Sequence, residues 1–497
     1  MNILIVGGGT AGLACALILQ KLTSYKITLM RSPNIPIIGV GEGTTEHWSD
    51  FCNLVQIPFQ EFFVHCDATF KNGVKFSNWT DNYYCHNINS ESLSNFYSKE
   101  HLLQRYLYSD VKDFHSFYNN KDLRFYINEK TNEWIGLPNQ MHLDTELLNN
   151  FLVSKLQDRG IEIIEDTVRD VILDENGVSS LKCETQDYSY DYYVDCTGLK
   201  GLLIKKFDGI QWLSHKNHLP LDLAMPFRTS HKEINDFYTG ARAMDNGWMW
   251  KVPVQSRIGW GYVYSSDFAT DVDCLKELVE IITFDNSEDQ DINRIIKFEA
   301  GRLNKCTAKN VTAIGLSSQF FEPLEATNIT SGILSSIQLG RNLSRFGTDQ
   351  FENKMNDHFD RLCINLSAFI QAHYMVDRED TPFWKHVKHN LVPYPHLMEI
   401  IELLSHGGLL REDDLNYEDL LFRPQNFNQI FYYLGMLDTS KNNQFISNLN
   451  DEDYNFVKDF FFSHPSNRFG PWVEPRDFFE AFKNYKTPNE VKELWKW

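Results

Sequence analysis

The sequence has few basic residues for a chain of its length. Lysine and arginine number 47 against 67 aspartates and glutamates, which gives a formal net charge of −20 over 497 residues. Negative charge of this size repels polyphosphate, and no cluster of basic residues offsets it locally. The composition therefore excludes nucleic acid as an expected partner.

The chain also lacks cysteine pairs and long apolar runs. Its nine cysteines are scattered, odd in number and free of any CxxC spacing, so neither a disulfide framework nor a metal site is predicted. No stretch reaches the roughly 20 uninterrupted apolar residues that a membrane-spanning helix needs. The apolar opening, residues 1–19, has no basic start and is interrupted by three glycines. We therefore expect a cytoplasmic protein with no membrane partner.

What the chain does have, at its amino-terminal end, is a nucleotide-binding pattern. An apolar run over residues 2–6 leads into GGGTAG (7–12), which is followed by apolar residues at helical spacing and a second strand pattern. In this context Gly7 allows a tight turn, Gly9 lets backbone N–H groups approach a pyrophosphate, and Gly12 lets helix and strand pack closely. The pattern predicts a dinucleotide site.

One position departs from the usual dinucleotide pattern. The acid that normally ends the second strand and holds the adenosine ribose is replaced by Arg31. Arg31 can reach a phosphate, stack on adenine, or stay in solvent while backbone groups hold the ribose. The sequence leaves these three roles open.

Further glycine-rich strand ends favour FAD over NAD. They are IIGVGEGTTEHW (37–48), YYVDCTGLKG (192–201) and VTAIGLSS (311–318). Distant strand ends that converge on one extended ligand suit FAD, and the chain has no second complete GxGxxG unit for NAD(P)H. The reducing equivalents are therefore expected from another protein.

The stretch DNGWMWKVPVQ (245–255) places two indoles on one side of a strand. Residues two apart in an extended chain share a face, so Trp248 and Trp250 are predicted neighbours. The alternating segment 257–266 follows and indicates an antiparallel pair. Taken alone, the two indoles are typical of a sheet face packed on a core.

Seven motifs in order over residues 1–385 change that interpretation, because together they resemble the flavin-dependent halogenases, the tryptophan halogenase family. The motifs are GGGTAG (7–12), GVGEGT (39–44), ATFKNGVKFSNW (68–79), DCTGLKGLLI (195–204), GWMWKVP (247–253), FEPLEATNI (321–329) and QAHYMVDREDTPFW (371–384).

The resemblance implies an α/β fold: an FAD-binding, Rossmann-like flavoprotein monooxygenase-type fold with a β-sheet substrate region and a helical C-terminal part. We expect a discontinuous FAD-binding module over 1–205 and 290–345. A strand-rich region over 206–289 carries the two indoles, and a mainly helical, substrate-covering region spans 346–497.

The same resemblance assigns the reacting residues. Trp248 and Trp250 are expected to form a barrier between flavin and substrate. Lys71, rather than Lys75, is the expected catalytic lysine; it would hold hypohalous acid as an ammonium or react with it as an amine, and the sequence does not decide between these routes. Glu325 is the expected catalytic carboxylate.

The halide site departs from the family pattern. Where the family commonly has Ser-Thr-Gly, this chain reads Ala326-Thr327-Asn328. Backbone N–H groups of Thr327 and Asn328 are expected to bind the halide, because backbone donors do not depend on the side chain. Chloride, bromide and iodide all stay open.

The expected cofactor is FAD, acting as FADH2, and its predicted contacts come from four parts of the chain. They are Gly7, Gly9, Thr10, Ala11 and Gly12 at the pyrophosphate, Gly41, Glu42 and Gly43 in the second loop, Val168 at the adenine through its backbone, and Ile329 near the ring. His142 and His373 are expected to be structural or flavin-side residues rather than acid–base catalysts.

The resemblance implies an enzyme that forms hypohalous acid at a flavin hydroperoxide and halogenates an electron-rich aromatic substrate. Expected partners are a flavin reductase supplying FADH2, a halide ion and an aromatic small molecule such as an indole, phenol or pyrrole. The alternative is an FAD-dependent aromatic monooxygenase that hydroxylates directly. The region 416–437 does not reproduce the clamp of tryptophan-specific members, so the substrate stays open, as does homo-oligomerisation.

Overall fold

The computed structural model describes most of the chain. The described residues are 1–35, 41–86, 99–109, 125–135, 137–230, 237–282, 294–347, 351–415, 421–462 and 471–496. Residues 39–40 of the second glycine-rich loop and residues 416–420 of the expected substrate region lie outside them. Within these ranges, no helix is both long enough and apolar enough to cross a membrane.

A six-stranded sheet lies under the nucleotide-binding pattern. In order it contains β10 (Glu162–Glu165), β2 (Lys26–Arg31), β1 (Asn2–Val6), β14 (Tyr192–Asp195), β23 (Val311–Ala313) and β22 (Thr307–Ala308). The first five strands run parallel and β22 is antiparallel. The central strand β1 is a continuous apolar run because helices cover both faces of such a sheet. The carboxyl ends of its strands therefore share one edge.

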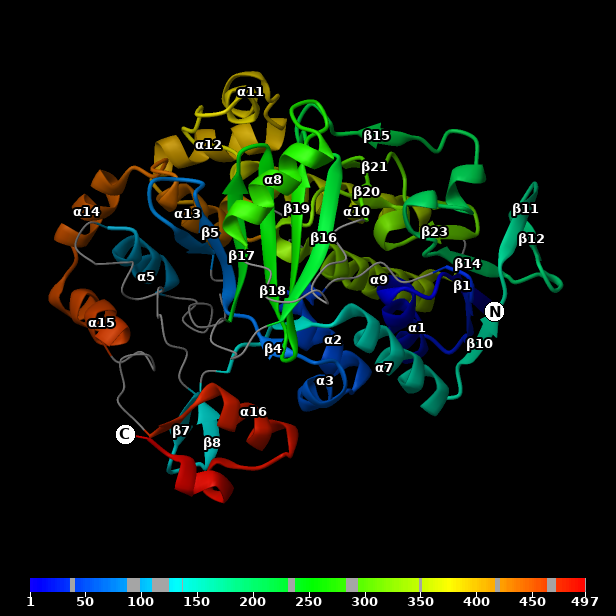
Figure 1. Ribbon diagram of the computed structural model, residues 1–497, viewed down its shortest axis with the longest axis horizontal. Coiled ribbons are helices and arrows are strands. Elements are labelled where there is room, and N and C mark those ends of the chain that lie inside the picture. Colours follow the sequence, from blue (N-terminus) through cyan, green and yellow to red (C-terminus); the bar gives the residue numbers. More distant parts are fainter. Residues whose placement is uncertain are drawn as a thin grey trace.

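A seven-stranded sheet forms the second layer of the molecule (Figure 1). In order it contains β20 (Ile296–Lys297), β16 (Leu223–Ser230), β19 (Arg257–Tyr264), β18 (Gly247–Pro253), β17 (Tyr238–Met244), β5 (Gly73–Ser77) and β6 (Tyr84–His86). The predicted antiparallel pair is β18 and β19, with Trp250 opposite Gly261. The sheet also takes in strands from residues 73–86, so the lysine motif lies in the same sheet as the tryptophan motif, with β17 between them.

Strand alternation gives this sheet two different faces. Met249 and Tyr262 pack with Leu278 of α8 (Asp271–Ile281) in a small separate core, and Figure 1 shows α8 across that face. Trp248 and Trp250 point the other way and belong to, or pack against, the main core. The predicted side-by-side arrangement of the two indoles is therefore confirmed.

Four three-stranded sheets contain the remaining paired strands of the described residues. They are β3 (Glu42–Gly43), β9 (Met141–Leu143) and β4 (Thr69–Phe70); β11 (Val168–Asp174), β12 (Gly177–Cys183) and β13 (Asp187–Tyr188); β15 (Trp212–Ser214), β21 (Gly301–Leu303) and β24 (Gln319–Phe320); and β25 (Trp472–Val473), β7 (Phe125–Asn128) and β8 (Glu133–Ile135). The first is the one that matters for the site, because β9 joins the second glycine-rich loop to the strand that precedes Lys71.

The described helices cover the sheets and dominate the carboxyl-terminal third. They are α1 (Thr10–Leu22), α2 (His47–Val55), α3 (Phe59–His65), α5 (Glu100–Leu107), α7 (Thr145–Asp158), α8, α9 (Thr327–Phe346), α10 (Glu352–Ala372), α11 (Pro382–Asn390), α12 (Pro395–Gly407), α13 (Pro424–Tyr433), α14 (Thr439–Ser447), α15 (Asp451–Phe462) and α16 (Pro475–Lys483). Short 3₁₀ turns η3 (Gly315–Ser317) and η4 (Leu324–Ala326) precede α9. The expected helical carboxyl-terminal part is confirmed.

Candidate functional site

The first glycine motif forms a turn in which side chains have no room. Gly7 has a φ of +129°, and a Cβ atom there would lie 2.1 Å from the backbone oxygen of Cys196. A Cβ atom on Gly12 would lie 2.0 Å from the backbone oxygen of Gly7. The turn and the close helix–strand packing therefore both require glycine.

The start of α1 is shaped to receive an anion. A Cβ atom on Gly9, the residue that caps α1, would meet nothing within 4 Å, and no side chain caps the helix. The first N–H groups of a helix have no intrahelical partner, so they are available to a phosphate. Gly315, which begins η3 just after β23, packs so closely on Ala11 that a Cβ atom would lie 2.8 Å from the Cβ of Ala11. Strand ends far apart in sequence thus meet at one place, and this cradle fits the pyrophosphate of FAD.

Arg31 has a partner within the protein. Its guanidinium forms an ion pair with Glu165 of the neighbouring strand β10, and its Cβ lies against Gly8. Beside it, the Ser32 and Thr167 hydroxyls are 2.8 Å apart, which places Val168 next to the end of β2. At the position expected to lie near the adenosine of FAD, an acid is usual. This chain has instead an arginine that is paired with the carboxylate of Glu165.

The second glycine-rich loop lies between the lysine and tryptophan motifs. A Cβ atom on Gly41 would lie 3.3 Å from Val252, which shares a strand face with the two indoles. A Cβ atom on Gly43 would lie 3.4 Å from both the Nζ of Lys71 and the Cβ of Ala326. Between them Glu42 keeps a partly exposed surface, but burial raises the pKa of its carboxyl to about 7.

Lys71 is a fully buried lysine. It follows β4, where its backbone N–H donates to Gln140, and its Nζ donates a 2.8 Å hydrogen bond to the backbone oxygen of Thr44. Burial lowers the pKa of Lys71 to about 8, although the negative charge of Glu325 raises it. The group is therefore mostly an ammonium at neutral pH while staying close to its titration range.

Glu325 is a buried carboxyl in an unusual backbone conformation. Its φ is +65°, the left-handed region, and its side chain has no exposed surface. Oε1 lies 2.9 Å from Nδ1 of His86 and 3.3 Å from Nε2 of His373, although neither contact has the alignment of a full hydrogen bond. Burial raises the pKa of Glu325, but these two imidazoles together lower it to about 2. Glu325 is an anion facing a nearby ammonium.

The predicted halide residues begin α9. Ala326 caps this helix with a left-handed φ of +54°, and its side chain offers no capping hydrogen bond. Thr327 is buried and Asn328 half-buried in the first turn. Backbone N–H groups at a helix start attract a small anion, so the local geometry is compatible with the expected halide site.

Ala326→Gly is expected to stabilise the folded protein by about 0.5 to 1 kcal/mol. A left-handed conformation costs a residue with a Cβ about 1 to 2 kcal/mol, and the greater freedom of glycine in the unfolded chain offsets part of the gain. Thermal and urea unfolding measure the change. Ala14→Gly, in the interior of α1, is the control and should destabilise by about 1 kcal/mol; a loss of stability in both variants would contradict the strain assigned to Ala326.

The two indoles of the tryptophan motif are held differently. Trp248 is buried, and its Nε1 donates a 3.3 Å hydrogen bond to Oε2 of Glu322, which also accepts a 2.6 Å bond from the hydroxyl of Tyr374. Trp250 lies over Gly261, where a Cβ atom would come within 2.0 Å of its ring. The ring centroids are 6.4 Å apart. Glu322, three residues before Glu325, therefore anchors the first indole.

The structure adds residues that the sequence did not single out. His86 ends β6, and Asn426 of α13 lies 3.1 Å from its Nε2. Tyr84 contacts Nδ1 of His373 at 3.3 Å. One signal was available: Asn426 is one of four amide side chains that α13 buries, and buried polar groups need partners. His142 sits between the Thr69 and Thr239 hydroxyls, a structural position.

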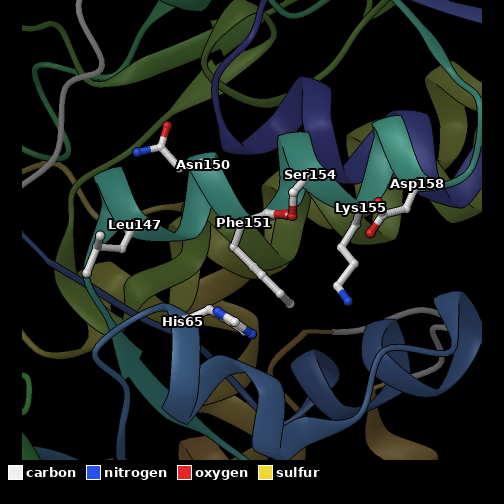
Figure 2. A pocket seen from close by; sticks show the side chains of 7 residues that line it. All are labelled: His65, Leu147, Asn150, Phe151, Ser154, Lys155 and Asp158. Carbon is white, nitrogen blue, oxygen red and sulfur yellow. The ribbon is translucent and has the colours of Figure 1, made fainter.

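A surface hollow elsewhere in the chain is a poor candidate for a site. It lies between α3 and α7 (Figure 2), where the ring of His65 stacks on Phe151 with centroids 5.1 Å apart and Lys155 pairs with Glu61. Its histidine and its lysine thus already have contacts within the protein, and the hollow contains none of the predicted site residues. Within the described ranges, no group of three or more His, Cys, Asp or Glu side chains could hold a metal ion.

Comparison with known proteins finds similar chains over most of this sequence. A family model described as tryptophan halogenase matches residues 2–448. Tryptophan 7-halogenase RebH of Lentzea aerocolonigenes is 33% identical over 423 residues, 77% of this chain and 78% of the relative. Tryptophan 6-halogenase SttH of Streptomyces toxytricini is 29% identical over 79% of this chain and 82% of its own length.

Solved structures share the fold. Tar14, a tryptophan C-6 flavin-dependent halogenase from taromycin biosynthesis, has a TM-score of 0.80 at 25% identity, with 97% of this chain and 99% of that chain covered. A tryptophan halogenase from Shewanella frigidimarina has a TM-score of 0.82 at 24% identity over 98% of both chains, a likeness of fold alone. The predicted fold class is confirmed.

Proposed function

The chain belongs to the tryptophan halogenase family, which makes it a flavin-dependent halogenase and an oxidoreductase, and from this premise we propose how its residues carry out the reaction. The proposed activity is halogenation of an electron-rich aromatic small molecule, with reduced FAD supplied by a separate flavin reductase. The observation that carries the proposal is the approach of the buried Lys71 ammonium and the buried Glu325 carboxylate beside the second glycine-rich loop.

The fit of the flavin rests on the glycine cradle. The open cap at Gly9 and the uncapped start of α1 would hold the pyrophosphate of FAD, with Thr10, Ala11 and the second loop beside it. Bound FADH2 would supply two electrons that reduce O2, and the oxygen activated in this way would oxidise halide to hypohalous acid, with water as the other product. The backbone N–H groups of Thr327 and Asn328 would position the halide.

The two indoles are proposed to separate the flavin from the aromatic substrate. Trp248 is fixed by Glu322, and Trp250 is wedged against the bare backbone of Gly261, so neither ring can easily turn aside. A rigid wall of this kind excludes an organic ring while a small inorganic molecule passes. It would thereby favour halogenation over direct oxygenation.

On the substrate side, Lys71 is proposed to act as an ammonium. Its Nζ donates to Thr44 and keeps further N–H groups to orient hypohalous acid toward the arene. Glu325 is proposed to balance that charge and to accept the proton that the ring loses as it regains aromaticity. The substrate is an indole, phenol or pyrrole, since electrophilic attack needs an electron-rich ring.

The proposal is tested by halide dependence of the product. The protein is incubated with FAD, a flavin reductase, NADH and a panel of electron-rich arenes, in separate reactions with chloride, bromide, iodide or no halide. Products carrying the mass of the added halogen support halogenation and identify the preferred halide. Halide-independent insertion of oxygen would instead support the aromatic monooxygenase, and retained flavin without any product would contradict both activities.

The pH dependence of halogenation separates the two possible roles of Lys71. Because its pKa is about 8, the ammonium route predicts that product formed per flavin oxidised falls as pH rises through this value. The amine route predicts a rise over the same range. Lys71→Arg is the control, since arginine stays charged throughout; if its profile matched that of the unmodified protein, the pH dependence would belong to another group.

A further inference from the structure

The amide of Asn426 fixes the tautomer of His86. The backbone N–H of Arg423, which caps α13, donates a 2.7 Å hydrogen bond to Oδ1 of Asn426, so the amide nitrogen must be the atom that faces His86. That nitrogen lies 3.1 Å from Nε2 of His86, and an amide nitrogen can only donate. Nε2 is therefore the acceptor, and the proton of a neutral His86 resides on Nδ1.

The protonated nitrogen of His86 is the one beside the catalytic carboxyl. Nδ1 lies 2.9 Å from Oε1 of Glu325, and both side chains have no exposed surface. Hydrogen bonds at catalytic groups are often poorly aligned before substrate binds, so the imperfect angle of this contact is expected to improve in the loaded site. Asn426, His86 and Glu325 thus form a chain of donors that leads from the start of α13 to the reacting group.

A second histidine, His373, contacts the same oxygen of Glu325. Nδ1 of His373 lies 3.3 Å from the hydroxyl of Tyr84, and its Nε2 lies 3.3 Å from the same oxygen, Oε1 of Glu325. Burial lowers the pKa of His373, so this ring is neutral at pH 7. Its single N–H can therefore point either to the hydroxyl of Tyr84 or to Glu325, but not to both. Neither oxygen of Glu325 has a fully aligned hydrogen-bond partner among the described residues, but both imidazole contacts are made to Oε1 and neither is made to Oε2. The two oxygens of this buried carboxylate are therefore not equivalent.

We propose that Asn426 is a positioning residue that holds His86 as the Nδ1–H tautomer, which anchors Oε1 of Glu325 and leaves Oε2 as the oxygen that takes the proton from the substrate. This inference rests on the proposed halogenation. In that step the ring C–H bond breaks, its electron pair restores the aromatic system, and an O–H bond forms at Oε2. His86 contacts Oε1 through Nδ1 and keeps its own proton during the step, so Oε2 is left to accept the proton of the ring.

Asn426→Asp is the sharpest test. It replaces the amide nitrogen that faces His86 by a carboxylate oxygen of similar size, and it keeps Oδ1, which accepts from the backbone N–H of Arg423 at the start of α13. His86 must then place a proton on Nε2 as well, and an imidazolium beside Glu325 makes that carboxylate a weaker base. Nitrogen-15 NMR of histidine-labelled protein is expected to show His86 protonated on Nδ1 alone in the unmodified chain and on Nε2 in the variant. Product formed per flavin oxidised is expected to fall about tenfold to 100-fold, with substrate KM unchanged.

Asn428→Asp is the matched control. Asn428 is also buried in α13, but its amide donates to Gln104 and to the backbone of Leu410 rather than to a histidine. This variant carries the same cost of a buried charge and should leave the His86 spectrum and the product ratio unchanged. Equal loss in both variants would reduce Asn426 to a structural residue and overturn the inference.

If Asn426→Asp does not fold, the nitrogen-15 spectrum of the unmodified protein still tests the position of the His86 proton. His86→Gln identifies the His86 signals by their loss. A proton on Nε2 of His86 in the resting protein would overturn the inference whatever the activity. Absence of any halide-dependent product from the unmodified protein would instead overturn the proposed function, so the two failures are distinguishable.

Discussion

Lys71→Met is expected to reduce halogenated product by about 10² to 10³-fold while the rate of flavin oxidation by O2 stays within about twofold. The size of the effect is that of removing one charged donor from a buried reaction site. Methionine fills nearly the same space, so the loss would come from the ammonium rather than from a cavity. Product is measured by mass spectrometry, and flavin oxidation by its absorbance.

The Lys71→Met variant is expected to be at least as stable as the unmodified protein, which is unusual for a change at a buried active-site residue. The unmodified protein buries the Lys71 charge completely, and the lowered pKa shows that burial disfavours it. An apolar replacement is therefore expected to leave thermal stability unchanged or to raise it. A large loss of stability would show instead that the Nζ contact with Thr44 is needed to hold the second loop.

Lys75→Met is the matched control within the same motif. Lys75 points outward from β5 and lies over the ring of Tyr83 at 4.4 Å. Its loss should leave halogenation unchanged, because an exposed cation contributes little to a buried site. Comparable loss of product in both variants would mean that the assignment of the catalytic lysine to Lys71 is wrong.

The parts of the fold that the sequence predicted are those set by local geometry. The turn at Gly7 and the contact at Gly12 leave no room for a side chain, so glycine at this spacing is close to obligatory. The alternation around Trp248 and Trp250 follows from the geometry of a single strand. Such features depend on few residues, and those residues are neighbours in the chain.

The features that the sequence did not predict depend on distant polar partners. His86 and Asn426 are 340 positions apart and become neighbours only when β6 meets α13. Nothing in the motif FEPLEATNI shows that the carboxyl of Glu322 accepts a hydrogen bond from Trp248. Buried polar groups must find partners, but a single sequence does not say which. The electrostatics of the site therefore came from the structure.

The same limit applies to Arg31. Three roles were open from the sequence, and the ion pair with Glu165 now provides a local one. The pairing acid comes from β10, a strand that follows β2 by more than a hundred residues but lies beside it in the sheet. Sheet order, rather than the motif, thus determined the partner.

Glu325 and Glu322 offer the second large prediction, because two buried acids three residues apart are shifted in opposite directions. The histidine contacts lower the pKa of Glu325 to about 2 despite its burial, whereas burial raises the pKa of Glu322 to about 8. At pH 7 the first is an anion and the second mostly a neutral acid. A pair separated in this way indicates different roles.

Glu325→Gln is expected to lower halogenation by about 10² to 10⁴-fold, because glutamine cannot accept the proton of the ring and no longer balances Lys71. Glu322→Gln should change it by no more than about threefold, since an amide oxygen can still accept from Trp248 and Tyr374 and the lost group was already neutral. Product formed per flavin oxidised at pH 7 measures both. A reversed order, with Glu322→Gln the more damaged variant, would transfer the role of proton acceptor to the acid that anchors the indole.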